Sequence, residues 1–491
     1  MPFPAGSTST ITTGSTPRSE PHPSPGSTTW LDITARPPPP PLHATPPGGR
    51  WAVESKDAEA HPPRHENAHV SRETAADRAR RGEARPPMRI AVVGAGIGGL
   101  ALAAGLQRRG ADVFVLESSP TLRSGGTAIT LAPNALRALE SLGYGDALAE
   151  HPFAVRTDVA AQRSPSGRTL TLLPSEVLAR TRVMLREELH LMLAAGVTSG
   201  RIRLGCRVES VTTAGTVRFT DGNGVARTWA FDLVVGADGA HSAVRRAWPN
   251  DPGLQDAGYA AWRAITREPV DLTGPDGIHA AGETWGNGAR FGFAPLADGR
   301  AYWFAVETDA LLKARCEERD APSADLLQRL DALFSGWHAP IPQLIAATDP
   351  ADMHFSPVQE LARDLPTFSQ GRLVLVGDAA HAMTPNLAQG GAQSLEDAAT
   401  LAICLDHLLT EPPGLVSTDR LRRALDRYDT LRLPRLREIT RLSRNLGTIA
   451  HLRMPGAAAL RNFALRRLPD SRIAEPIRRI ADWRPPPPTC R

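Results

Sequence analysis

Short apolar runs that end near glycine or an acidic residue recur along this 491-residue chain. Helical periodicity follows the first run at Ala101–Arg109, and after the last run it begins again near Ala392. Strands that alternate with helices in this way predict an α/β fold built on a parallel sheet. The runs with the hydrophobicity of strands buried on both faces are Ile90–Val93, Val113–Leu116, Asp232–Val235 and Arg372–Val376.

A second pattern occupies residues 253–367, where aromatic side chains concentrate and apolar positions alternate with polar ones. The segments Arg290–Phe293 and Ala301–Val306 lie on either side of Asp298-Gly299, which is typical of antiparallel strands joined by a turn. Residues 153–173 have the form of a hairpin around the turn at 164–167. These segments predict a sheet domain distinct from the parallel sheet.

The first strand and helix enclose a glycine motif at Gly94, Gly96 and Gly99, and the second strand ends on Glu117. The first glycine permits a tight turn, the second leaves room for a pyrophosphate, and the third lets helix and strand pack closely. Glu117 lies roughly 20 residues beyond the motif, where a carboxylate can accept hydrogen bonds from a ribose. This pattern predicts an adenine-dinucleotide site and leaves FAD and NAD both open; a glycine-rich βαβ unit without a ligand is the alternative.

Two further buried strands end in a glycine and an acid, at Asp238-Gly239 and at Gly377-Asp378. The glycine motif and the stretches 234–245 and 377–398 carry a family resemblance that covers residues 88–440. This part of the chain resembles the FAD-dependent aromatic hydroxylases, which are the group A flavoprotein monooxygenases similar to para-hydroxybenzoate hydroxylase. The stretches 258–263 and 283–286 resemble the branch of salicylate hydroxylase, urate hydroxylase and zeaxanthin epoxidase.

The resemblance implies a Rossmann-like FAD-binding domain with an inserted antiparallel-sheet substrate domain and C-terminal helices. It implies that Glu117 holds the adenosine ribose, that Arg186 contacts the flavin side and that Asp238 serves FAD phosphate and NAD(P)H docking. The residues expected to bind FAD are Gly94, Gly96, Gly99, Glu117, Arg186, Asp238, Gly239, Gly377, Asp378, Pro385, Gly390 and Gly391.

The activity that the resemblance implies is an NAD(P)H- and FAD-dependent monooxygenase that transfers one oxygen atom from O2, through a flavin C4a-hydroperoxide, to an aromatic or polyene small molecule. Hydroxylation and epoxidation both fit. No catalytic side chain is assigned, and His381 is expected to be structural because it belongs to the turn after Asp378. The candidate substrate contacts are Tyr259, Trp262, Arg263, Trp285 and Arg290.

Composition excludes several classes of function and leaves the predicted fold unchanged. The net charge is only +4 and no basic stripe is interleaved with aromatic residues, so we expect no nucleic-acid partner. The four cysteines are scattered, which predicts neither structural zinc nor a disulfide framework and favours the cytoplasm. No apolar run has the length of a membrane span. We expect a monomer or a homodimer.

Residues 1–87 are rich in proline, serine and charge and are expected to be a disordered extension, with Met88 as the start of the folded protein. The extension contains His65-Glu66-Asn67-Ala68-His69, a chance match to a zinc motif without a helix or third ligand. Arg80-Arg81, shortly before an apolar stretch, resembles a twin-arginine export signal. That apolar stretch is the glycine motif itself, so cleavage after the stretch would destroy the fold, and we expect no export.

The expected domain boundaries divide the chain into alternating pieces. They are 1–87 for the extension, 88–152, 181–252 and 368–410 for the FAD-binding domain, 153–180 and 253–367 for the substrate domain, 411–484 for the C-terminal helical region and 485–491 for a tail.

Other functions remain open. A flavoprotein that binds FAD or a pathway intermediate without redox turnover would share the motifs. A flavin-dependent halogenase is less favoured, because neither Lys56 nor Lys313 follows the glycine motif suitably and the Trp-x-Trp-x-Ile-Pro element is missing. A second glycine motif, typical of Baeyer–Villiger enzymes, and the Gly-x-Ser-x-Gly of serine hydrolases are also missing from the sequence.

Overall fold

The computed structural model describes residues 87–122, 127–153, 160–173, 178, 180–279, 281–308, 323–409, 417–454 and 456–488. The expected disordered extension, apart from Pro87, and its His65–His69 motif lie outside these residues. Within them, none of the helices combines the length and the apolar character that crossing a membrane requires.

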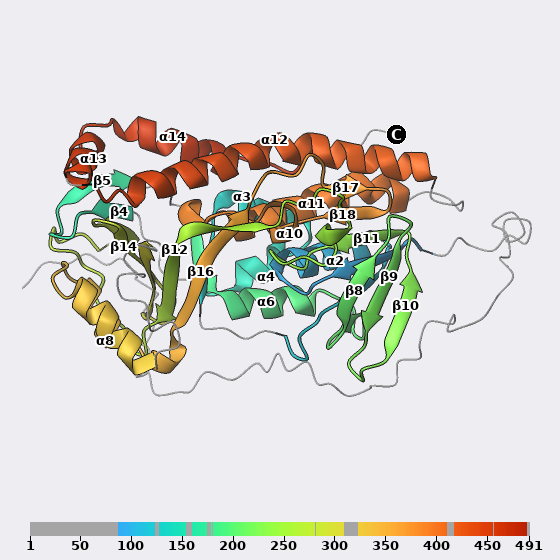
Figure 1. The fold of residues 1–491 in the computed structure, drawn as a ribbon, viewed down its shortest axis with the longest axis horizontal. Coiled ribbons are helices and arrows are strands. Elements are labelled where there is room, and N and C mark those ends of the chain that lie inside the picture. The colour runs from blue at the N-terminus through green and yellow to red at the C-terminus, as the bar shows by residue number, and fades with distance from the viewer. Residues whose placement is uncertain are drawn as a thin grey trace, which may run out of the picture. The chain divides into compact units, whose positions relative to one another are not determined.

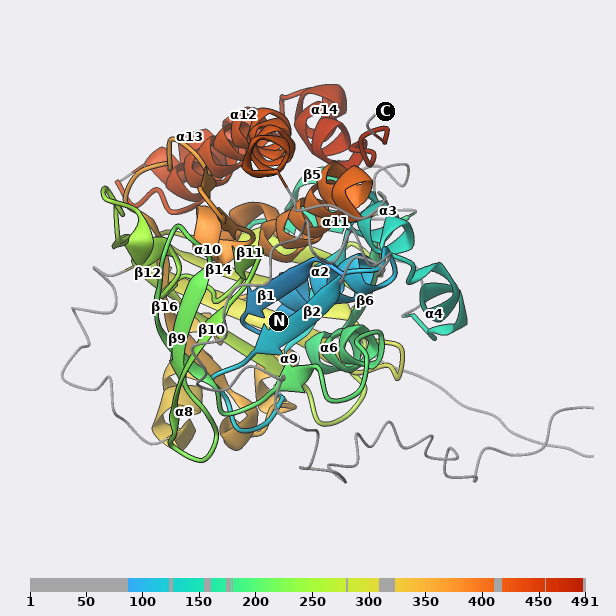
Figure 2. The ribbon, with the colours of Figure 1, turned by 90° about the vertical axis from the view of Figure 1, so that its right-hand side faces the viewer.

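The predicted buried strands lie side by side in one sheet, here called the parallel sheet (Figure 2). Its central strands pair in parallel, and only the edge strand β17 runs antiparallel to its neighbour among the described strands. In the described part of the chain its order is β17 (Ser369–Gln370), β18 (Leu373–Leu375), β11 (Leu233–Gly236), β1 (Arg89–Val93), β2 (Asp112–Leu116) and β7 (Ile202–Arg203).

Helices cover this sheet because its strands are apolar on both faces. The helix α2 (Ile97–Gln107) packs against β1 and β2 and is buried along almost its whole length. The helix α11 (Gly390–Leu409) packs against α2 and is itself covered by α12 (Thr418–Ala450), which runs along it in Figure 1. The carboxyl ends of β1, β11 and β18 therefore open toward the first turns of α2 and α11.

The second predicted sheet, here called the antiparallel sheet, is also present. It includes residues 160–173, the described strands of the hairpin predicted over 153–173, and the first of these strands joins the sheet by parallel pairing with β13. In the described residues its order is β16 (His354–Leu361), β12 (Leu254–Ile265), β15 (Ala301–Thr308), β14 (Ala289–Pro295), β13 (Ala281–Trp285), β4 (Ala160–Arg163) and β5 (Thr169–Leu173).

The two faces of the antiparallel sheet differ in chemistry, because successive side chains of a strand point to opposite faces. One face packs Phe291 and Trp303 against Phe334 of α8 (Ser323–Phe334) in an apolar core. The strand registers place Tyr259 and Arg290 on the opposite face. This face, which carries both polar and apolar side chains, is here called the candidate substrate face.

The remaining elements connect and cover the two sheets. The strand β10 was not predicted; it extends the predicted β8–β9 hairpin. These elements are β3 (Ala128–Leu131), β6 (Arg182–Leu185), β8 (Arg207–Val211), β9 (Thr216–Thr220), β10 (Ala226–Ala230), α3 (Pro133–Ser141), α4 (Gly145–Glu150), α6 (Arg186–Ala195), α9 (Ile341–Ala346), α10 (Asp378–His381), α13 (Ala457–Leu465), α14 (Asp470–Ala481), η1 (Arg245–Ala247), η2 (Pro350–Asp352) and η3 (Pro385–Leu387).

A buried network of charges joins α11 to α12. The guanidinium of Arg432 donates to Asp397 at 2.7 Å and to Glu396 at 2.5 Å, and all three side chains are almost fully buried. Glu396 also accepts from Arg435 at 2.7 Å and from Asn134 of α3 at 2.7 Å. Burial acts to raise the pKa of both carboxyls, but the arginines, and for Asp397 also His381, outweigh it and hold both pKa values below their usual range.

Replacing Arg432 by Met is expected to lower the free energy of unfolding by about 3–5 kcal/mol, because two buried carboxylates lose their partner. The matched control is Arg422→Met on the exposed face of the same helix, where the ion pair with Asp426 contributes less than about 1 kcal/mol. Denaturant unfolding of the two variants and the parent protein measures the difference. Equal losses in both variants would contradict a dominant role for the buried pair.

Candidate functional site

The glycine motif forms the turn between β1 and α2, and its three glycines serve different needs. Gly94 has a φ of +103°, and a Cβ there would lie 2.4 Å from the carbonyl oxygen of Ala237. A Cβ on Gly99 would lie 2.2 Å from the carbonyl oxygen of Gly94. At Gly96, by contrast, the protein atom closest to an added Cβ would be 4.0 Å away. Protein packing therefore requires the outer glycines, whereas Gly96 leaves open space at the start of α2.

Two side chains hold this turn in place. Glu117 accepts a hydrogen bond from the backbone N–H of Ala95 at 2.8 Å, and its other carboxylate oxygen accepts from the N–H of Ser119 at 2.8 Å. On the other side, His190 of α6 places its Nε2 2.5 Å from the carbonyl oxygen of Ala95. The structure thus brings Glu117 to the glycine motif, as expected, and adds His190, which no local sequence motif indicated.

Asp238 follows β11, next to the glycine motif, but its carboxylate points into the protein. One oxygen accepts from the hydroxyl of Ser242 at 2.5 Å, and the other accepts from the N–H of Ala243 at 2.6 Å. Burial raises the pKa of Asp238 above its usual value. The backbone of Ala237 and Asp238 faces Gly94, while the Asp238 side chain holds its own turn. The role expected of Asp238 toward FAD phosphate and NAD(P)H stays a prediction. Gly239, with a φ of +77°, completes that turn.

The turn after β18 presents an exposed carboxylate. Gly377 has a φ of +61° and donates its N–H to the buried Asp397 at 2.8 Å, which anchors the turn to α11. The neighbouring Asp378 is exposed, and its Oδ1 lies 4.0 Å from where a Cβ of Gly390 would be. The Asp378 carboxylate is therefore directed toward the first residue of α11, where it can bind a hydroxyl group.

The segment from Pro385 to Gly391 bends tightly between η3 and α11. Ala388 has a φ of +51°, the only left-handed value at a non-glycine among the described residues, which is an energetically costly conformation for alanine. The buried Gln389 next to it accepts from Asn134 at 3.0 Å, and Gly391 packs against Ile129. The bend is therefore held from within the protein, and its outer edge carries the exposed Pro385.

Asn386, in this bend, contacts the candidate substrate face. Its side-chain oxygen accepts from Arg290 at 2.8 Å, and its amide group donates to the hydroxyl of Tyr259 at 3.0 Å. Arg290 is 2% exposed, forms an ion pair with Glu283 at 3.0 Å, and has no hydrogen-bond partner for its Nε among the described residues. Two predicted substrate contacts, Tyr259 and Arg290, thus lie together beside the glycine-rich bend.

Two further arginines, Arg263 and Arg186, lie near a tyrosine of the candidate substrate face. Arg263 donates to Ser356 at 2.8 Å and lies near Tyr302, whose pKa is raised by burial although Arg263 acts to lower it. Arg186, at the start of α6, is close enough to influence the same tyrosine. Arg186 from α6 and Arg263 from β12 therefore both lie near Tyr302. Tyr302 was not among the predicted site residues, although the alternation of β15 assigns it to this face.

The two predicted tryptophans are placed differently. Trp262 lies on the opposite face of the sheet, in the core against α8 and α9, with its ring 4.3 Å from that of Phe355. Trp262 is therefore not brought together with Tyr259 and Arg290, and the substrate contact expected of it stays a prediction. Trp285 is on the candidate substrate face but buried, with the guanidinium of Arg461 5.3 Å from its ring.

His451, just after α12, completes the far side of the site. Its ring lies 4.3 Å from the ring of Tyr259. Burial and the nearby Arg290 and Arg461 lower the pKa of His451 to about 3, so the ring is neutral at physiological pH. The sequence held no signal for His451, because it is distant along the chain from every motif.

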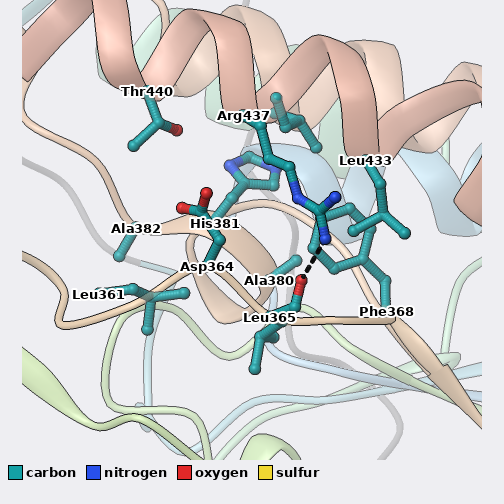
Figure 3. A pocket seen from close by; sticks show the side chains of 11 residues that line it. Leu361, Asp364, Leu365, Phe368, Ala380, His381, Ala382, Leu433, Arg437 and Thr440 are labelled. Carbon is teal, nitrogen blue, oxygen red and sulfur yellow. Dashed lines mark hydrogen bonds between the residues drawn. The ribbon is translucent and has the colours of Figure 1, made fainter.

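A small pocket lies elsewhere, between α12, α10 and the segment 361–368 (Figure 3). It is lined by His381, whose Nε2 lies 2.6 Å from the buried Asp397, and by Arg437, which donates to the carbonyl oxygen of Leu365. None of the predicted site residues lines this pocket. The contact with Asp397 supports the structural role expected of His381.

The residues at the two turns fit a dinucleotide. Gly96 supplies bare backbone at a helix N-terminus, where a pyrophosphate can approach. Glu117 and Asp378 supply carboxylates at the ends of β2 and β18, and the oxygens of Glu117 keep acceptor capacity beyond the two backbone contacts. The carboxyl edge of a parallel sheet is where such ligands bind in open α/β folds.

Comparison with known proteins agrees with this geometry. Residues 88–443 match the family model described as "FAD binding domain". The chain is 34% identical to the aurachin C monooxygenase/isomerase of Stigmatella aurantiaca, over 81% of this chain and 98% of that protein. It is 34% identical to the 3-amino-4-hydroxybenzoate 2-monooxygenase of Streptomyces cremeus, over 74% of this chain and 88% of that protein.

Among solved structures, that of Klebsiella pneumoniae HpxO complexed with FAD and uric acid is similar with a TM-score of 0.68 and 26% identity. The likeness covers 80% of this chain and 96% of that one. The predicted fold class and the predicted family are both confirmed. The chain belongs to the FAD-binding family of aromatic monooxygenases similar to para-hydroxybenzoate hydroxylase.

Proposed function

We propose that this protein uses NAD(P)H and O2 to hydroxylate or epoxidise an electron-rich aromatic or unsaturated small molecule. The observation that carries the proposal is the contact of Arg290 and Tyr259 with Asn386, which joins the candidate substrate face to the glycine-rich bend. A substrate held by this face would lie against the bend from Pro385 to Gly391, which contains residues that the family resemblance assigns to FAD binding. The relatives named as monooxygenases support the reaction class.

The chain's own residues bind and orient the reactants. Glu117 would bind the adenosine ribose of FAD, and the open backbone at Gly96 would lie against its pyrophosphate. Asp378 would bind the ribityl chain. When bound, FAD supplies the redox chemistry: it accepts a hydride from NAD(P)H and passes electrons to O2. In balance, one oxygen atom of O2 enters the substrate, and the other leaves as water with the two electrons of NAD(P)H and one further proton.

The substrate contacts on the candidate substrate face combine charge with a dry environment. Arg290 offers its Nε–H, which has no partner among the described residues, to an anionic or phenolic oxygen. The ring of His451 is neutral and therefore adds no second positive charge beside Arg290. An apolar cluster of Tyr259, Ala261, Val306 and Val358 lies on the same face. Exclusion of water by such a surface keeps reactive oxygen from being lost as peroxide.

We further propose the domain organisation given by the sequence pattern. The antiparallel sheet would be the substrate domain, formed by residues 153–180 and 253–367 and inserted between FAD-binding pieces at 88–152, 181–252 and 368–410. The helical region 411–484 would cover both. We also propose a cytoplasmic monomer or homodimer; the buried free thiols of Cys206 and Cys404 are consistent with a reducing compartment.

The decisive experiment is to purify the protein and follow NAD(P)H oxidation with phenolic and polyene compounds, together with product mass. We expect flavin absorbance, substrate-stimulated NAD(P)H oxidation and a product that has gained one oxygen atom. A yellow protein that never oxidises NAD(P)H would instead favour a binding role without turnover. A halogenated product would favour the halogenase alternative.

Replacing Gly96 by Val is expected to weaken FAD binding at least about tenfold, or ~1.4 kcal/mol, because the side chain would occupy the open space at the start of α2. Protein stability without FAD should change little, since the protein atom closest to an added Cβ, the carbonyl oxygen of Ala237, is 4.0 Å away. Gly336→Val is the matched control, because that glycine is also open but lies far from the turns in sequence and is exposed. Fluorescence titration of the apoprotein with FAD measures both variants; equal affinity would exclude a pyrophosphate at Gly96.

Replacing Arg290 by Met is expected to raise KM for an acidic or phenolic substrate by roughly 10- to 100-fold, the cost of a hydrogen bond to a charged group. FAD content should remain that of the parent protein. Arg300→Met, at the exposed turn between β14 and β15, is the control. Steady-state kinetics with bound flavin quantified in parallel makes the comparison, and an unchanged KM would remove Arg290 from the substrate contacts.

A further inference from the structure

Exposed apolar side chains concentrate at one end of the protein. Among the described residues, five of the seven large apolar side chains that are exposed fall between residues 449 and 468. Met454 and Leu460 are the most exposed, at 72% and 70%. Scattered single apolar residues on a surface are ordinary, but a concentration of this kind marks an interaction site. The five are Ile449, Met454, Leu460, Phe463 and Leu468.

The helix α13 presents this surface because its polar anchor faces inward. Arg461 is 5% exposed and donates to the carbonyl oxygens of Ala450 and Gly286 at 2.8 and 3.1 Å. Helical geometry then places Phe463 on the opposite side of the helix and Leu460 about 100° from Arg461, and both are exposed. The usual amphipathic arrangement is reversed, with a cation inside and apolar residues outside.

The same surface is strongly basic. Arg453, Arg466, Arg467 and Arg472 are exposed, and Asp470 is the sole acidic residue in the sequence between 449 and 472. The guanidinium of Arg467 lies 4.0 Å from the ring centre of Phe463. Apolar side chains flanked by arginines are the pattern of helices that lie in the interface of an anionic membrane. We call these nine residues, the five apolar ones and the four arginines, the α13 patch.

We propose that the α13 patch docks the protein onto the surface of an anionic lipid bilayer. Its apolar side chains would enter the boundary of the acyl chains, while the arginines contact lipid phosphates. A second copy of the chain is a less suitable occupant, because a twofold contact would bring like charges together. This is surface binding by an interfacial helix, and it does not depend on the proposed reaction.

The position of the patch gives the docking a spatial consequence. Arg461 connects α13 to the carbonyl groups of Trp285 and Gly286, at the end of β13 on the candidate substrate face. His451, which stacks on Tyr259, lies between Ile449 and Met454 in the chain. A bilayer bound at the α13 patch would therefore lie next to the antiparallel sheet rather than next to the glycine motif.

The test is sedimentation of the full-length, flavin-loaded protein with vesicles. We expect binding to vesicles of phosphatidylglycerol and phosphatidylcholine, weaker binding to phosphatidylcholine alone, and a decrease with added salt. The double variant Leu460→Ser/Phe463→Ser should lose at least about tenfold in partitioning. The variant Arg466→Gln/Arg467→Gln should lose about fivefold per arginine on anionic vesicles.

The matched apolar control is Val225→Ser/Leu431→Ser, which alters the two large apolar residues that are exposed outside the patch in the described part of the chain. This control should bind like the parent protein, and all variants should keep their flavin content and melting temperature. Failure of the parent protein to bind anionic vesicles, or equal loss in the control, would overturn the proposal. So would a concentration-dependent dimer in sedimentation velocity that the Leu460→Ser/Phe463→Ser variant abolishes, because a second copy would then be the occupant.

Discussion

Arg432 is held inside the protein by Glu396 and Asp397, and these buried ion pairs fix the turn after β18 and the helices packed around it. Burying such charges is costly, and only complete hydrogen bonding compensates for it. Here the same two carboxylates also bind Arg435, Asn134, His381 and the N–H of Gly377. Through them α3, α10, α11 and α12 are tied to one point, and the turn after β18 is fixed relative to the bend that precedes α11.

The site itself is formed by segments that are far apart in the chain and meet at the carboxyl edge of the parallel sheet. The glycine motif is held by Glu117 and His190, whereas the bend from Pro385 to Gly391 is held by Gln389 and Asn134. Asn386 then links this bend to Arg290 and Tyr259. Positions set by packed helices and buried hydrogen bonds are well suited to a flavin enzyme, because the protein's main task there is orientation and exclusion of water.

The charges at the site follow the same logic. Arg290 is buried and has an unpartnered Nε–H among the described residues, while the ring of His451 beside it stays neutral. A donor of this kind costs free energy unless a ligand accepts from it. By contrast, Asp238, which the family resemblance had suggested as a ligand contact, satisfies its oxygens within its own turn. The polar groups that remain available are therefore those of Glu117, Asp378 and the candidate substrate face.

The sequence by itself determined features that depend on neighbouring residues: the central strands of the parallel sheet, the glycine turns, the helices α2 and α11, and the family. Periodicity and positive φ values are local properties. Only the tertiary structure decided which face each side chain occupies and which distant segments meet. A shift of one residue moves a strand side chain to the opposite face, and so Trp262 belongs to the core while Arg263 does not. Asn386, Tyr302 and His451 belong to the site, and Glu396 and Asp397 bind Arg432, only through contacts between residues that are far apart in the sequence. No local sequence pattern could indicate such contacts.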